Sequence, residues 1–115
     1  MEVVVIGAGP AGVMAAARAA ELGAKTTLVT RDAFGGMAAN DGPVPVRTLA
    51  HAARLLSAAR QLHRYGIAVA EPRLAYSGLL ERVREVVGDV RERSGLRDQA
   101  ERLGVAIRER AGTVR

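Results

Sequence analysis

Apolar residues near the start of the chain form two short runs separated by an alanine-rich stretch. The first run, EVVVIG over 2–7, is rich in β-branched residues and predicts a strand buried on both faces, as in a parallel sheet. The second run, KTTLVT over 25–30, predicts another strand. The stretch between them predicts a helix that stops at Gly23, with a thin sheet-facing side made of Ala15, Ala16, Ala19 and Ala20. The pattern predicts a strand–helix–strand unit over residues 1–32.

Helical spacing dominates the rest of the chain. Apolar residues recur at this spacing over 46–66 and again over 76–104. The second stretch predicts a long amphipathic helix, loosened around Gly88 or Ser94–Gly95, and its short, irregular stripe disfavours a coiled coil. The segment GIAVAEP between them is expected to be extended, and VAIRERAGTVR over 105–115 resumes strand character.

These elements predict an α/β fold, namely a Rossmann-like βαβ domain. Two strong strands and one or two weak ones cannot be covered on both faces, because parallel sheets need neighbouring strands and helices on each side. The expected parallel sheet, with its flanking helices, is therefore incomplete. Residues 1–115 are interpreted as a partial domain with three parts: the βαβ unit over 1–32, a loop and helix over 33–64, and a long helix with a closing strand over 75–115.

Three glycines follow the first strand in the spacing G-x-G-x-x-G. Gly7 allows a tight turn, Gly9 lets the backbone approach a pyrophosphate, and Gly12 lets the helix pack close to the strand. The exposed amides and the dipole at the start of the helix favour an anion. A glycine-rich turn without a ligand is the alternative, but the strand before it and the helix after it favour a dinucleotide site.

The end of the second strand departs from the usual dinucleotide pattern. An Asp or Glu is expected there to bind the ribose, but the residue is Thr30, followed by Arg31 and Asp32. A threonine cannot bind a diol as a carboxylate does. Arg31 either meets a 2′-phosphate, which would favour NADP in a nicotinamide-binding version, or is a surface cation.

Composition narrows the classes of protein that the chain can belong to. Its 115 residues suffice for one domain, and 49% hydrophobic with 25% charged residues is globular composition. Aromatic residues are only 3%, so a core of Ala, Val, Leu and Ile is expected. The absence of cysteine excludes disulfides, thiolate metal sites and thiol catalysis within the chain.

The charge and the apolar runs bear on partners and location. The net charge of +5 comes mostly from Arg that alternates with Glu along the helices, which indicates a solvated helix face rather than a nucleic-acid surface. The longest uncharged run is shorter than the ~20 residues of a membrane span, and Glu2 stands where a signal peptide needs a basic residue. We expect no membrane span, no nucleic-acid partner and a soluble cytoplasmic location.

The loop GGMAANDGPVPVRTL over 35–49 carries a resemblance to a known family. The chain resembles the N-terminus of the pyridine nucleotide–disulfide oxidoreductases, which include dihydrolipoamide dehydrogenase and mercuric reductase. Members bind FAD through a G-x-G-x-x-G unit and then carry a loop with two redox cysteines. The ungapped matches to that loop are Gly35, Gly36, Asn40, Gly42, Val44, Pro45 and Leu49.

The chain departs from the family pattern at the residues that take part in the family's redox chemistry. Ala38 and Pro43 stand at the two cysteine positions, and Arg47 replaces the lysine that lies near the flavin. Because neither residue supplies a thiolate, reduction of a disulfide, lipoamide or glutathione by this loop is excluded. Flavin binding and hydride uptake from NAD(P)H remain open, with electrons leaving to a quinone, a dye or oxygen.

The resemblance also implies cofactor-binding residues and partners. FAD is the expected cofactor, NAD(P)H is a second nucleotide, and missing domains or a partner chain are expected, with a homodimer left open. The residues expected to bind the cofactor are Gly7, Gly9, Pro10, Ala11 and Gly12 at the pyrophosphate, Thr30 and Arg31 at the ribose, Gly36 and Met37 behind the dinucleotide, and Arg47 near the isoalloxazine. No catalytic side chain or metal ligand is predicted, and His51 and His63 are interpreted as exposed helix residues.

Three hypotheses follow from these patterns. The first is the FAD-binding portion of a flavin-dependent NAD(P)H oxidoreductase that lacks the redox disulfide and passes electrons to a non-disulfide acceptor. The second is a non-enzymatic dinucleotide-binding or interaction module. The third is an inactive, truncated homologue. A bound flavin that NADPH reduces would contradict the second and third.

Overall fold

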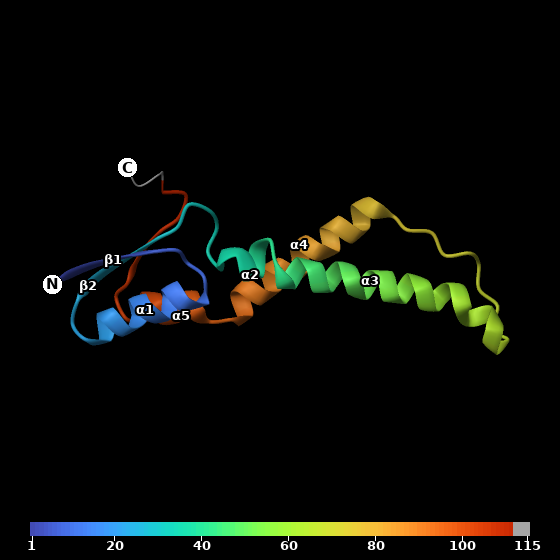
Figure 1. Cartoon of the computed structure of the whole chain (residues 1–115), viewed down its shortest axis with the longest axis horizontal. Coiled ribbons are helices and arrows are strands. Elements are labelled where there is room, and N and C mark those ends of the chain that lie inside the picture. The colour runs from blue at the N-terminus through green and yellow to red at the C-terminus, as the bar shows by residue number, and fades with distance from the viewer. Residues whose placement is uncertain (112–115) are drawn as a thin grey trace.

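A computed structural model describes residues 1–111 and arranges them as a small parallel sheet with a long helical arm (Figure 1). The sheet and the N-terminus lie at one end of the molecule, and two antiparallel helices extend from it. The elements in chain order are β1 (Glu2–Ile6), α1 (Pro10–Glu21), β2 (Lys25–Val29), α2 (Gly36–Asn40), α3 (Pro43–Gln61), the 3-10 turn η1 (Leu62–Tyr65), α4 (Tyr76–Arg93), α5 (Leu96–Arg102) and β3 (Ala106–Arg108).

The sheet has three parallel strands in the order β1-β2-β3, which confirms the α/β class. Strand β2 lies in the centre, with its Val29 opposite Ile6 of β1 and Arg108 of β3. The strand expected over 105–115 is observed as Ala106–Arg108. The last part of that prediction, over 112–115, lies outside the described residues.

Helices α1 and α5 pack together over one face of this sheet (Figure 1). The core lies beneath that face and consists of Ala8, Val13, Ala16, Leu28, Phe34, Ala100 and Val105. Phe34 is an exception to the aliphatic core that the composition predicted. It is 5% exposed, and the guanidinium carbon of Arg97 lies 5.6 Å from the centre of its ring.

The prediction that β1 is buried on both faces is wrong for this chain. Val4 and Ile6 are 64% and 67% exposed, whereas their neighbours Val3 and Val5 on the other face are partly buried. The physical reason is that, among residues 1–111, α1 and α5 cover only one side of the sheet. The expectation that the sheet is incomplete is consistent with this bare face.

Helix α1 begins with Pro10 at its first position and ends where the sequence indicated. Gly23 lies just past it with a φ of +84°, and its amide donates to the carbonyl of Ala20 over 2.9 Å. Of the predicted thin side, Ala16 is buried and Ala19 and Ala20 are partly buried, whereas Ala15 is exposed. Ala17, which was not assigned to that side, is buried as well.

The arm is formed by α3, η1 and α4, and residues 67–75 link its two helices without regular structure. Helix α3 begins three residues earlier than its apolar spacing showed, because Pro43 and Pro45 lie in its first turn, where proline is tolerated. The long helix expected over 76–104 breaks at Ser94–Gly95, where Gly95 has a φ of +63°. Gly88 lies inside α4 and does not interrupt it.

The arm makes the molecule elongated. Its radius of gyration is 19.9 Å and its extents are 68 × 28 × 15 Å. A compact domain of this length would have a radius of gyration of about 13 Å. The sheet end is therefore packed as a domain, whereas the arm projects from it.

Candidate functional site

The glycine-rich turn connects β1 to α1 at the carboxyl edge of the sheet. Gly7 has a φ of +108°, which favours glycine, and its amide donates to the carbonyl of Val29 over 2.7 Å. A Cβ on Gly12 would lie 1.8 Å from the carbonyl oxygen of Gly7. The helix therefore rests directly on the turn, and only glycine fits at position 12.

A second glycine pair packs against this turn. The amide of Gly35 donates to the carbonyl of Ala8 over 3.0 Å. Gly36 has a φ of +64°, and a Cβ on it would lie 2.6 Å from the Cα of Gly9. The two glycine-rich segments, 27 residues apart in sequence from Gly9 to Gly36, are in backbone-to-backbone contact.

Within the G-x-G-x-x-G turn, Gly9 is the glycine that internal packing does not explain. Its φ of −77° suits any residue, and a Cβ there would meet only the Cα of Gly36, at an ordinary distance of 3.9 Å. The space beside Gly9 is therefore open. Next to it, the first turn of α1 presents the amides of Ala11 and Gly12, which have no acceptor within the helix. No acidic residue lies in that turn, so its partial positive charge is not compensated locally.

Thr30 and Arg31 lie at the same edge of the sheet but in different environments. Thr30 is 7% exposed, and its backbone is held by the carbonyl of Arg108 and the amide of Ala111 at 2.9 and 3.1 Å. Arg31 is exposed and pairs with its neighbour Asp32 over 3.0 Å. Such an exposed pair contributes little to stability, so the Arg31 guanidinium can change partner at low cost.

The two positions that hold cysteine in the resembled family lie on one small cavity. Ala38 and Pro43 both line it, together with Pro10 at the start of α1, and its volume is about 200 Å³. The other lining side chains are mostly apolar, with Arg91 and Ser94 as polar exceptions. No sulfur or other redox-active side chain occupies either position. Met37, one residue earlier, is 74% exposed.

Arg47 lies apart from the glycine loops. Its exposed side chain lines a groove of about 610 Å³ between α3 and α4. His51 and Arg82 are the other basic residues of this groove, and its remaining walls are mainly Val and Leu. The structure thus brings Gly7, Gly9, Gly12 and Gly36 together and leaves Arg47 on the arm.

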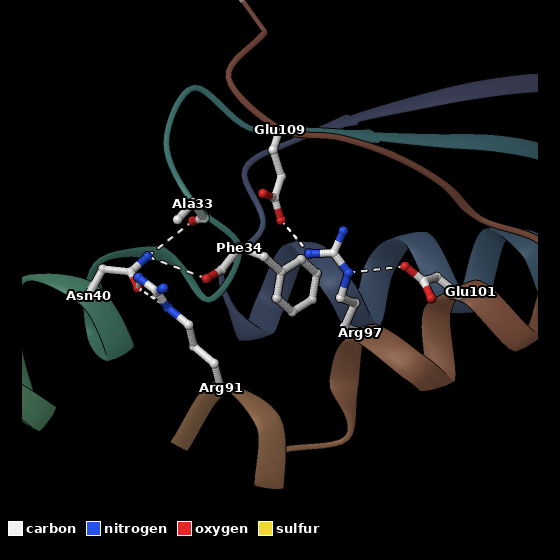
Figure 2. Close-up of polar contacts among 7 residues, drawn as sticks. All are labelled: Ala33, Phe34, Asn40, Arg91, Arg97, Glu101 and Glu109. Atoms are coloured by element: carbon white, nitrogen blue, oxygen red, sulfur yellow. Dashed lines mark hydrogen bonds and ion pairs between the residues drawn. The ribbon is translucent and has the colours of Figure 1, made fainter. Parts of the chain in front are cut away.

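Sequence reasoning missed the roles of Asn40 and Arg91. Asn40 was noted only as a match to the family loop, and Arg91 only as one of many cations on a solvated helix. Figure 2 shows the Arg91 side chain pointing at the Asn40 amide, which in turn faces the backbone of Ala33 and Phe34. The match of Asn40 to the family loop was the one sign in the sequence that this residue has a role, whereas nothing in the sequence indicated a role for Arg91.

Arg97 forms a second polar centre beside the same loop (Figure 2). It forms ion pairs with Glu101 and Glu109, and these hydrogen bonds, first the one to Glu109, raise the pKa of Arg97 above its usual value. The guanidinium therefore stays charged and ties α5 to the segment after β3. A cavity of about 280 Å³ separates this centre from Arg91.

Two other kinds of site were tested against residues 1–111. No group of three or more His, Asp and Glu side chains among them is placed to hold a metal ion. His51 and His63 are exposed on the arm, as expected from the sequence. None of the helices in the described part of the chain is both long enough and apolar enough to cross a membrane.

Comparison with known proteins identifies a family. A profile of the family described as FAD dependent oxidoreductase matches residues 2–107. The chain is 46% identical over 72 residues to a dihydrolipoyl dehydrogenase of Buchnera aphidicola, which covers 62% of this chain and 15% of that protein. It is 44% identical over 80 residues to dihydrolipoyl dehydrogenase 2 of Haloarcula marismortui, covering 70% and 17%. The match thus spans about a sixth of the length of these relatives.

Solved structures show the same fold. LpdA from Mycobacterium tuberculosis superposes with a TM-score of 0.71 at 22% identity, over 95% of this chain and 23% of that one. The HOCl-induced flavoprotein disulfide reductase RclA from Escherichia coli superposes with a TM-score of 0.67 at 21% identity, over 95% and 21%.

Proposed function

The chain belongs to the FAD-dependent oxidoreductase family, and from this premise we propose that it is the FAD-binding portion of a flavin-dependent NAD(P)H oxidoreductase without a redox disulfide. The resemblance to the FAD-binding part of the pyridine nucleotide–disulfide oxidoreductases is confirmed, and FAD is the cofactor that this family indicates. The electron donor, the acceptor and the partners are likewise proposed.

The open space beside Gly9 is the main support for FAD binding by this chain. Gly7, Gly12 and Gly36 are each required by a positive φ or by a contact that a Cβ would violate. Gly9 has neither constraint, so its lack of a side chain is explained by a ligand that approaches the backbone there. The unpaired amides of Ala11 and Gly12 lie beside that space and suit a pyrophosphate.

The remaining site residues are assigned by their place around this centre. Pro10 starts α1 without adding a side chain that reaches over the amides. Gly36 packs on Gly9 and Met37 follows it at the start of α2, and these two residues would line the dinucleotide. Thr30 and Arg31 lie at the end of β2, where the ribose is bound in Rossmann-like sites. Arg47 would contribute positive charge from α3.

The missing thiols define the chemistry we propose. FAD, when bound, would accept a hydride from NAD(P)H and pass on its two electrons, with the proton released separately. Ala38 and Pro43 offer no atom that could carry those electrons onward or form a covalent bond with substrate. The acceptor is therefore proposed to be a quinone, a dye or oxygen that meets the flavin directly.

The test is FAD retention by the purified chain, read from its visible spectrum after FAD is added and the sample desalted. We expect a retained flavin band for the wild type and its loss in Gly9→Ala, which fills the open space without a clash inside the protein. Gly88→Ala is the matched control, because it adds the same methyl group on the arm with nothing within 4 Å. Equal retention by the two variants would contradict the proposed site.

A second experiment addresses the acceptor. FAD-loaded protein reduced by a stoichiometric amount of dithionite is expected to return to the oxidised spectrum on adding a quinone or oxygen and to remain reduced with lipoamide under exclusion of oxygen. Reoxidation by lipoamide would contradict the proposal, since the loop holds no thiol to pass electrons to a disulfide.

A non-enzymatic nucleotide-binding module is the second candidate. The turn over residues 7–12 that is proposed to bind the pyrophosphate, called the pyrophosphate turn below, is complete within residues 1–36. Arg47, in contrast, lies apart from it on the arm, and this difference favours the second candidate. This candidate predicts that ADP binds as tightly as FAD and that no flavin band is retained. Titration with ADP and FAD side by side separates the two.

Further segments or a partner chain are proposed to complete the fold. The bare sheet face with Val4 and Ile6, and the exposed arm, are surfaces that such a partner would cover. NAD(P)H as the second nucleotide would bind on residues outside the described site. A homodimer and a cytoplasmic location remain predictions of the sequence.

A further inference from the structure

Arg91 joins the helical arm to the loop that packs on the pyrophosphate turn. It lies in the last turn of α4, is partly buried, and donates from Nε to the side-chain oxygen of Asn40 over 2.6 Å. A second nitrogen of the same guanidinium donates to the same oxygen (Figure 2). Within residues 1–111, this arginine forms no ion pair, so its charge is directed at a neutral amide.

Asn40 connects Arg91 to the backbone of the loop. Its side-chain nitrogen donates to the carbonyl of Ala33 over 3.0 Å and to that of Phe34 over 3.4 Å. The next residue, Gly35, is the one whose amide is bonded to Ala8. The charged donor on Arg91 polarises the amide of Asn40 and strengthens these bonds.

The stem of Arg91 also limits where the loop can move. A Cβ on Gly35 would lie 3.7 Å from the Cγ of Arg91, so the arginine stem lies next to the backbone of Gly35. On its other side, that backbone is held by Ala8. Gly35 is thus confined between α4 and the pyrophosphate turn, and Gly36 follows it against Gly9.

We propose that Arg91 is a positioning residue for the dinucleotide site, acting through Asn40 to hold Gly35 and Gly36 against the turn at Gly9. The inference rests on the proposed function, because it concerns the same FAD site. The effect of Arg91 is to keep the second wall of the site at the distance that the ligand needs.

The coupling is reciprocal. If the position of the arm fixes the loop that FAD contacts, FAD binding must in turn stabilise the base of the arm. Bound FAD is therefore expected to slow amide exchange in the last turn of α4 as well as at the glycine turn. An exchange effect confined to the turn would contradict the coupling.

The first test compares FAD affinity in three variants of the full chain. Arg91→Met keeps much of the apolar stem and removes the donors, and we expect about tenfold weaker FAD binding, in the range for loss of one charge-assisted hydrogen bond. Arg91→Lys keeps the charge and one donor and should recover part of that loss. Arg93→Met is the matched control, since Arg93 is exposed on the same turn and should bind FAD as the wild type does.

The second test needs no ligand. In Arg91→Met, the Gly35 amide should exchange at least several-fold faster than in the wild type, while the Gly7 amide, which is bonded within the sheet, should be unchanged. A general loss of stability would speed both amides together. Unchanged protection at Gly35, or unchanged FAD affinity in a folded variant, would overturn the proposal.

The two proposals fail in different ways. A wild type that does not bind FAD contradicts the proposed function, and the Gly35 exchange still decides whether Arg91 holds the loop. A wild type that binds FAD with an Arg91→Met variant that binds equally well contradicts only the positioning role. If Arg91→Met does not fold, Arg91→Lys provides the same comparison.

Discussion

The sheet end and the helical arm of this molecule are built from similar residues but are packed very differently. The sheet end buries its apolar side chains under α1 and α5, and Leu28 is fully buried there. The arm has helices of 19 and 18 residues, yet α3 has no buried residue and α4 has only Val87. An amphipathic helix is stabilised mainly by what covers its apolar face. The arm thus has the sequence pattern of a packed helix pair, but most of its apolar side chains are not buried.

The accessible surface area also shows that part of the molecule is loosely packed. The accessible surface is 8436 Å², compared with about 6,000 Å² for a compact monomer of this mass. The excess of about 2,400 Å² is about three times the area of ~800 Å² that one partner buries in a standard protein interface. Much of it lies on the arm, where Val46, Leu49 and Leu55 are exposed.

The largest contrast is expected for an added methyl group at two glycines. Gly12→Ala places a Cβ 1.8 Å from the carbonyl oxygen of Gly7, so α1 must leave its place on the turn. We expect the variant to lose its cooperative unfolding transition. Gly88→Ala on the arm meets nothing within 4 Å and should raise stability by about 0.5–1 kcal/mol, as for a glycine in a helix interior. Urea unfolding followed by circular dichroism measures both, and a stable Gly12→Ala would show that the turn is less closely packed than described.

Truncation of a leucine should give the next largest difference. Leu28 is 0% exposed in β2, whereas Leu55 in α3 is 58% exposed. Leu28→Ala is expected to lower the free energy of unfolding by about 2–5 kcal/mol. Leu55→Ala should change it by about 0.5 kcal/mol or less. The same measurement applies, and a large effect at Leu55 would mean that the arm is covered in solution, for example by a second copy.

The smallest contrast concerns two carboxylates paired with arginine. Glu109 binds Arg97 and links β3 to α5, and its side chain is 31% exposed. Glu85 pairs with Arg82 within one helix, with both side chains more than half exposed. Glu109→Gln should cost about 0.5–1 kcal/mol and Glu85→Gln less than about 0.5 kcal/mol. Thermal unfolding of the two variants at low and moderate salt checks this, and equal losses would contradict a special role for the Arg97 pair.

Local patterns were sufficient to predict the first part of the fold. The apolar runs of β1 and β2, the glycine spacing between them and the end of α1 at Gly23 depend on neighbours within a few positions. For that reason the α/β class and the location of the glycine turn were evident before the structure. The family resemblance added the second glycine pair, but it gave no physical reason why glycine is needed at those two positions.

The candidate site as a whole depends on contacts between distant segments. Gly36 needs no side chain because it presses on Gly9, and Arg91 matters because it reaches Asn40 from 51 residues away. A five-residue helix such as α2 is too short to show a period, which is why only a loop was expected there.

The sequence by itself determined the βαβ unit, the loss of the redox thiols and the helical character of the arm, because these follow from residue identity and local spacing. The tertiary structure decided which strand face is bare, where the long helix breaks into α4 and α5, and which residues hold the loop at Gly9. Those outcomes depend on which segments meet in space, and the period of a strand or helix does not encode its partner.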